Sequence, residues 1–214
     1  EFKHPYGFDQ PLDNWAELVV ANGFFDRAGI CLLSDVFQNT SYGPLKRALV
    51  KVDMEETFHL RHGEVWMRRL TKAGGEAKDL VQRAVDWMFP MTIEWFGLPD
   101  ALKRHSGQLG YKLKALTNDQ LRQTWMASTV PLCEQLGLNA PAHWDEQRGE
   151  YVLEYPFPCQ YDVADKRWAF DAGEISWDDV FKRWKGRGPM NEIYVESIQR
   201  SRGDVGRWLN GKVA

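Results

Sequence analysis

The sequence predicts an all-α core followed by an irregular, aromatic-rich arm. Through most of the first 140 residues, apolar side chains recur every three or four positions, which is the spacing of helices that bury one face. After residue 140 this spacing gives way to prolines, a glycine and alternating tyrosines, which favour loops and short strands. We therefore expect a helical core at 1–140, and an arm at 141–214 that either belongs to the same domain or extends to contact a partner.

Local start and stop signals bound the helices of the core. Pro44 suits the first turn of a helix, and Gly97 and Gly137 are typical of the residue just after a helix end. Thr117 and Gln120 have the spacing of a capping box, in which each side chain accepts from the backbone amide of the other residue. The expected helices are 13–38, 44–71, 76–96, a shorter one at 100–113, and 117–136.

The arm contains too many aromatic residues for a disordered segment. Alternation over 151–155 predicts a short hairpin within loops, and two further helices are expected at 176–185 and 189–210. We expect the arm to wrap the core or to grip a partner. Its aromatic residues include Tyr155, Phe157, Tyr161, Trp168 and Phe170.

Charge and composition exclude several classes of protein. The 214 residues carry a net charge of −3, which favours neither nucleic acid nor a membrane surface as a partner. No apolar run approaches the length of a transmembrane helix, and no signal-peptide pattern is recognisable. The three cysteines are widely spaced, as in reduced cytosolic proteins. We therefore expect a cytoplasmic protein.

Two polar residues interrupt the apolar stripe of the helix expected at 44–71. Glu56 and His59 stand where the stripe requires apolar residues, and a separation of three places them side by side on one face. Burying a carboxylate beside an imidazole is unfavourable unless something compensates the charge. A metal ion is one such compensation, and an ordinary hydrogen-bonded pair is another.

The helix expected at 13–38 carries a matching interruption at Asp26. The polar link after it is short, so the two helices should be antiparallel neighbours. Twelve residues separate Asp26 from the end of its helix, and twelve separate Glu56 from the start of the next, so both lie about 18 Å from the turn. Asp26 should therefore lie level with Glu56 and His59. Carboxylates with imidazole suit iron or manganese, although a buried polar network that holds two helices in register would explain the same residues.

These three residues correspond to half of a two-metal site. In helix bundles that hold two iron ions, two helices each give one carboxylate and two others each give a Glu-x-x-His pair. Asp26 matches the lone carboxylate, and Glu56 with His59 matches the pair. We expect the other half of the site to lie outside this chain.

Three stretches carry a resemblance to a known family. They are Thr40-Ser41-Tyr42-Gly43-Pro44, Lys51 with Glu55-Glu56-Thr57-Phe58-His59, and Leu116 to Gln123 with Thr129-Val130-Pro131. Together they resemble the catalytic A subunits of ring-1,2-phenylacetyl-CoA epoxidases, which are bacterial multicomponent di-iron monooxygenases with a ferritin-like bundle. The resemblance runs from about Trp15 to Ile198. It implies that Asp26, Glu56 and His59 are iron ligands, and that Glu55 supports a neighbouring ligand.

The resemblance also implies an activity and its requirements. A di-iron centre of two iron ions would use O2 to epoxidise the aromatic ring of phenylacetyl-CoA during phenylacetate degradation. Electrons from NADPH would arrive through a separate reductase, and the other partners would be a non-catalytic ferritin-like subunit and a small accessory subunit. Because members of the family carry a first helix pair before this region, we expect a partial bundle that lacks that pair and is inactive alone. Two alternatives remain: an epoxidase of another aromatic acyl-CoA such as benzoyl-CoA, and a metal-free ferritin-like scaffold subunit.

A coenzyme A thioester needs anchors for its phosphates. The amino end of a helix with nearby lysines provides them. Lys112, Lys114 and Asn118 lie at the start of the helix expected at 117–136 and are the candidates. The alternative is that both lysines are simply solvated.

Overall fold

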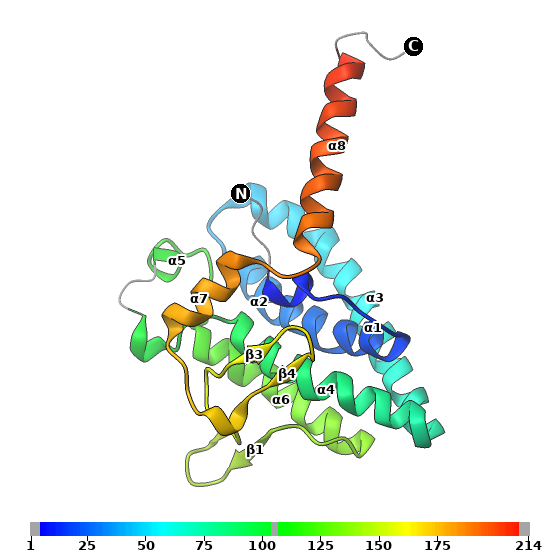
Figure 1. The fold of residues 1–214 in the computed structure, drawn as a ribbon. Coiled ribbons are helices and arrows are strands. Elements are labelled where there is room, and N and C mark those ends of the chain that lie inside the picture. Colours follow the sequence, from blue (N-terminus) through cyan, green and yellow to red (C-terminus); the bar gives the residue numbers. More distant parts are fainter. Residues whose placement is uncertain (1–4, 104–106, 210–214) are drawn as a thin grey trace.

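The computed structural model describes residues 5–103 and 107–209 (Figure 1). Its first long element is a helix of changing geometry. The α-helix α1 (Trp15–Ala21) continues into a π-helical segment, η2 (Asn22–Asp26), and then into α2 (Arg27–Asn39). The side chain of Asn14 caps α1 by accepting a hydrogen bond from the amide of Glu17 at 3.0 Å. The helix expected at 13–38 is therefore present, with a π-helical interruption that the sequence does not predict.

Two long helices pack on this element. They are α3 (Gly43–Ala73), which contacts α1, η2 and α2, and α4 (Gly75–Trp95), which contacts α1 and α3. Gly74 links them; its φ angle is 71°, and that of Gly75, the first residue of α4, is 53°. The expected helices at 44–71 and 76–96 are thus confirmed within one or two residues.

The segment after α4 differs from the expected helix at 100–113. Only a 3₁₀ turn, η3 (Asp100–Leu102), and one short helical turn, α5 (Gly107–Gly110), are present among the described residues. Both ends of α5 are glycines, and Lys112 has a left-handed φ of 51°, which stops a helix. The next helix, α6 (Asn118–Leu136), begins with the predicted capping box and ends at Gly137 with a φ of 63°.

The arm forms two small hairpins and two helices. β1 (Ala142–Asp145) pairs antiparallel with β2 (Glu150–Leu153), with Ala142 opposite Leu153. A second hairpin, β3 (Tyr161–Asp162) with β4 (Arg167–Trp168), was not expected, and a 3₁₀ turn, η4 (Phe170–Ala172), follows. α7 (Trp177–Gly186) lies beside the core, whereas α8 (Asn191–Leu209) extends away from it (Figure 1).

Aromatic residues form the centre of the core. Trp125 of α6 stacks edge-on against Phe24 and Phe89, with ring centroids 5.5 Å and 4.9 Å away, and its indole nitrogen donates to the carbonyl of Phe24 at 3.0 Å. Tyr161 and Ala142 of the arm are buried in the same core, so the arm wraps it. The division at residue 140 stays a prediction. The fold is all-α with small sheets, consistent with the expected ferritin-like bundle, and no helix in the described part of the chain is long and apolar enough to cross a membrane.

Candidate metal centre

Three side chains with metal-binding atoms converge where η2 faces α3. Asp26 is the last residue of η2, and Glu56 and His59 lie near the middle of α3. One carboxylate oxygen from each acid and one imidazole nitrogen all lie within 4.8 Å of one another. Metal–ligand bonds are about 2 Å long, so donor atoms on one ion lie up to about 4 Å apart. Small rotations of the three side chains would therefore let them share an ion.

A contact between two glycines fixes this alignment. A Cβ on Gly63 of α3 would lie only 2.5 Å from the backbone nitrogen of Gly23 in η2 and 2.8 Å from the carbonyl oxygen of Val19. Neither backbone can retreat as a side chain does, so the two elements touch only because residue 63 lacks a Cβ. The contact lies about one turn from Asp26 and one turn from His59, and it therefore sets the level at which the ligands meet.

The π-helical geometry places Asp26. A π-helical segment accommodates an extra residue in the turn, and such segments are frequent at functional sites. Because η2 ends at Asp26, it determines how that residue is rotated about the helix axis relative to α2. The apolar spacing does not reveal this feature. The available signal is the Asn22–Gly23 pair, whose residues favour turns over a regular helix.

The candidate ligands are less buried than the sequence predicts. Asp26 and Glu56 are half-buried and His59 is exposed. The apolar stripe predicts the face of α3 that meets α1, η2 and α2. It does not show which residues on the flank of α3, beside that face, stay exposed. In the described structure that flank exposes Val50, Met54 and Phe58, and Phe58 is 73% exposed.

Partial burial still changes the acid–base properties of the carboxylates. It raises the pKa of Asp26 to about 7, with a further contribution from the charge of Glu56, whereas His59 opposes the shift. Burial likewise raises the pKa of Glu56. Two carboxylates and one imidazole leave an excess of negative charge in this cluster. Its donor set therefore fits a divalent cation of the iron or manganese type.

Glu55 does not join the cluster. Its side chain is 57% exposed and forms an ion pair with Lys51 at 3.5 Å on the outer surface of α3. The expectation that Glu55 supports a neighbouring ligand is therefore not favoured by the structure. The one-residue offset from Glu56 turns it about 100° around the helix.

The candidate coenzyme A residues separate into two groups. Lys114 is buried, and its Nζ donates to Oδ1 of Asn118 at 3.1 Å, at the start of α6. Both side chains line a cavity of about 320 Å³ whose other walls include Leu32, Val36, Leu45, Trp95 and Phe96. Lys112 is exposed, is absent from this wall, and instead accepts a hydrogen bond on its carbonyl from the amide of Ser41 at 2.7 Å.

A second lysine takes the place expected for Lys112. The Nζ of Lys103 donates to the same Oδ1 of Asn118 at 3.3 Å. Burial lowers the pKa of Lys114 and the charge of Lys103 lowers it further, whereas the carboxylates of Asp35 and Asp100 oppose the shift. Two ammonium groups share one neutral acceptor, and each has further N–H groups that can donate to an anion. Lys103 is not among the residues predicted from the sequence, because it lies 15 residues before Asn118 and within a segment expected to be helical.

A buried acid holds the segment that carries Lys114. Oδ2 of Asp35 in α2 accepts from the backbone amides of Ala115 at 3.0 Å and Leu116 at 3.1 Å. The carboxylate therefore anchors the chain just before α6 and fixes the position of Lys114 relative to α2.

Comparison with known proteins identifies the family. The family model of the phenylacetic acid catabolic protein matches residues 1–174. The chain belongs to this family. It is also similar to one component of the 1,2-phenylacetyl-CoA epoxidase of Escherichia coli (strain K12), the subunit designated A, with 30% identity over 206 residues. That alignment covers 94% of this chain and 60% of the relative, so the chain spans about three-fifths of the relative's length.

Membership of the phenylacetic acid catabolic protein family confirms the resemblance expected from the sequence. The matched residues include both candidate sites and end before α7. Glu1 and His4 also have the Glu-x-x-His spacing. The sequence therefore contains a further candidate pair for the half of the site that was expected to lie outside the chain. Both lie outside the described residues, so among the described residues the candidate metal ligands are Asp26, Glu56 and His59.

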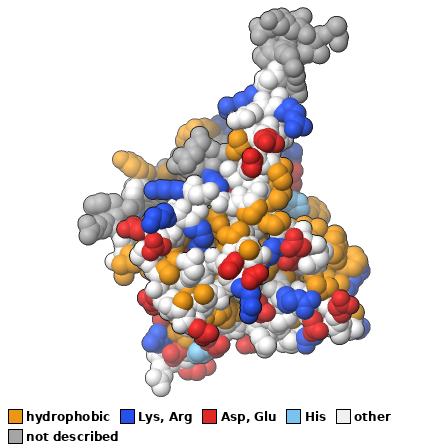
Figure 2. Space-filling view, viewed as in Figure 1, with side chains coloured by type: hydrophobic (Ala, Val, Ile, Leu, Met, Phe, Trp, Pro, Cys, Tyr) orange, Lys and Arg blue, Asp and Glu red, His pale blue; other side chains and the backbone are white. Residues whose placement is uncertain are grey.

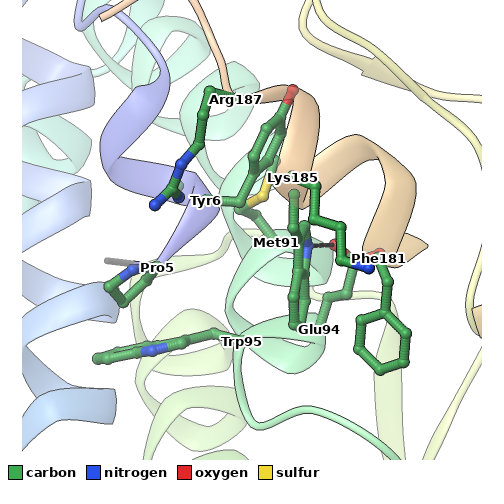
Figure 3. Close-up of a pocket in the computed structure, with 10 residues that line it drawn as sticks. Pro5, Tyr6, Met91, Glu94, Trp95, Phe181, Lys185 and Arg187 are labelled. Carbon is green, nitrogen blue, oxygen red and sulfur yellow. Dashed lines mark hydrogen bonds between the residues drawn. The ribbon is translucent and has the colours of Figure 1, made fainter. Parts of the chain in front are cut away.

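A further cavity lies on the other side of Trp95. It measures about 450 Å³ and lies between η1 (Tyr6–Asp9), α4 and α7 (Figure 3). The carboxylate of Glu94 is buried there; it pairs with Arg183 and accepts from the indole nitrogen of Trp184 at 3.1 Å. Trp95 lines this cavity as well as the one beside Lys114. None of the three candidate metal ligands lines the cavity of Figure 3.

Proposed function

We propose that this chain is the catalytic subunit of a di-iron monooxygenase that epoxidises the aromatic ring of phenylacetyl-CoA. The observation that carries the proposal is the convergence of Asp26, Glu56 and His59 within 4.8 Å, on elements held together by a backbone contact. Family membership and the similarity to an epoxidase subunit support the reaction class.

The residues present fit iron. Asp26 and Glu56 offer hard, negatively charged oxygen atoms, and His59 offers a neutral nitrogen. Bound iron would supply the reduction of O2 and the delivery of one oxygen atom to the ring, with electrons from NADPH through a separate reductase. A two-iron site needs more ligands than these three. We propose that the remaining ligands approach over the exposed flank of α3, where His59 lies.

The substrate would be held at both ends. Lys103, Lys114 and Asn118 would bind the phosphates of coenzyme A, while the acyl end would reach toward Asp26 and Glu56. The partners proposed for this chain are a non-catalytic ferritin-like subunit, a small accessory subunit and the reductase, all in the cytoplasm.

Metal analysis with a matched pair of variants tests the proposal. Glu56→Ala removes a proposed ligand, whereas Glu55→Ala removes the adjacent exposed acid that pairs only with Lys51 among the contacts described. We expect iron in the purified protein to fall to background in Glu56→Ala and to remain unchanged in Glu55→Ala, with epoxidation of phenylacetyl-CoA following the iron content.

Two outcomes would contradict parts of the proposal. Equal iron in both variants would remove Glu56 from the ligand set, and a wild-type protein without iron would favour a scaffold subunit. Faster conversion of benzoyl-CoA than of phenylacetyl-CoA would keep the iron site and overturn the substrate.

A further inference from the structure

Gly29 lies between the two candidate sites on one face of α2. Asp26 precedes it by three residues, and Leu32 and Val36, which line the cavity beside Lys114, follow it on the same face. At a rise of 1.5 Å per residue, this face connects Asp26 to the cavity over about 9–15 Å. A ligand that extends from Lys114 along this face of α2 toward Asp26 passes Gly29.

The missing side chain of Gly29 leaves a gap about one methyl group wide between a carboxylate and an indole ring. A Cβ built on Gly29 would lie 3.8 Å from Oε2 of Glu56 and 3.8 Å from Cη2 of Trp95, with no other described atom within 4 Å outside its own helix. Both distances are ordinary van der Waals contacts. Glu56 and the edge of Trp95 thus face each other across Gly29, and Trp95 is itself a wall of the cavity.

We propose that this gap is the slot for the aromatic ring of the substrate, and that Gly29 and Trp95 are the residues that determine which ring fits. The inference rests on the function proposed above. A ring that passes over Gly29 lies beside Glu56, and the aromatic edge of Trp95 offers it a favourable ring–ring contact. The thioester then extends back along α2 toward Lys114 and Asn118.

The decisive variant is Gly29→Ala. The added methyl group meets nothing closer than 3.8 Å, and alanine is a better helix former than glycine. The variant should therefore fold with an unchanged or higher Tm, which separates an effect on the slot from a loss of structure. Gly203→Ala in α8 is the matched control, because a Cβ there has no atom within 4 Å.

Calorimetric titration of the iron-loaded protein, purified with any subunits that accompany it, measures the effect. We expect the Kd of phenylacetyl-CoA to rise about tenfold or more in Gly29→Ala, since one methyl group in an apolar pocket has an effect of this order. The Kd of coenzyme A itself should not change, because it binds at the lysine end. Trp95→Phe shortens the wall and should lower the Kd of naphthylacetyl-CoA relative to phenylacetyl-CoA.

The outcomes separate the slot from the proposed function. If wild-type protein binds phenylacetyl-CoA more tightly than coenzyme A and Gly29→Ala keeps that preference, the slot is wrong and the proposed function stands. If wild-type protein does not distinguish the two ligands, the proposed substrate is wrong and the slot falls with it. An equal loss in Gly203→Ala would also overturn the slot.

Discussion

Lys103 and Lys114 both donate to a single oxygen atom of Asn118, and the carboxylates of Asp35 and Asp100 act on Lys114 from nearby. At the other site, Asp26 and Glu56 lie beside one imidazole. Single residues thus place donors for an anion at one end of the α2 face and oxygen and nitrogen donors for a cation at the other. This arrangement matches a ligand with phosphates at one end and a metal-directed group at the other.

The two lysines of the Tyr111-to-Lys114 segment should therefore behave differently. Lys114→Gln removes a buried cation from the cavity wall, and Lys112→Gln removes an exposed one that does not line it. A hydrogen bond to a charged group contributes about 1.5–3 kcal/mol, so Lys114→Gln should weaken coenzyme A binding roughly tenfold to a hundredfold. Lys112→Gln should leave the Kd, measured by titration calorimetry, within about twofold of wild type. Equal weakening in both variants would place the phosphates elsewhere.

At the level of elements, counting residues from the turn correctly predicted that Asp26 lies level with Glu56 and His59. That count works because α2 and α3 rise steadily from a short link. Periodicity failed at the same site in two ways: it does not show η2, and it does not show which flank of α3 stays exposed. The expected helix at 100–113 failed because two glycines and a left-handed Lys112 outweigh the apolar pattern.

The contact between η2 and α3 yields a prediction of its own. Gly63→Ala would place a Cβ 2.5 Å from a backbone nitrogen, so α3 must move away from η2. Overpacking of this kind destabilises by about 1–3 kcal/mol, and the shift should also lower iron content because the ligands come from the two separated elements. Gly43→Ala, where a Cβ meets only the flexible end of Arg47 at 3.4 Å, is the control in the same helix. Urea unfolding with metal analysis measures both effects, and an unchanged Gly63→Ala protein would contradict this role of the contact.

At the scale of the whole molecule, the arm is fastened to the core by buried charges. Oε1 and Oε2 of Glu94 in α4 pair with Arg183 of α7, and the Nζ of Lys166 lies over the ring of Trp87 at 5.3 Å. On the face shown in Figure 2, acidic and basic side chains are interspersed, with no large area of one sign.

Lys166 makes the clearest test of how the arm is held. In the turn between β3 and β4, its Nζ donates to the carbonyl of Pro11 at 2.6 Å and to the carboxylates of Asp13 at 2.6 Å and Glu17 at 2.7 Å. Lys166→Met would leave the buried Glu17 without its cation, so we expect the free energy of unfolding to fall by about 2–3 kcal/mol.

The matched control for this change is Lys182→Met, in the same arm. Lys182 is 84% exposed and its ion pair with Asp179 spans 3.6 Å, so its loss should change the free energy of unfolding by less than about 0.5 kcal/mol. Urea titration followed by tryptophan fluorescence measures both variants, and its signal includes Trp168 of the arm, whose indole nitrogen donates to the carbonyl of Trp87 at 2.8 Å. If Lys166→Met unfolds at the same urea concentration as Lys182→Met, apolar packing of Tyr161 and Trp168 holds the arm, and the charges do not.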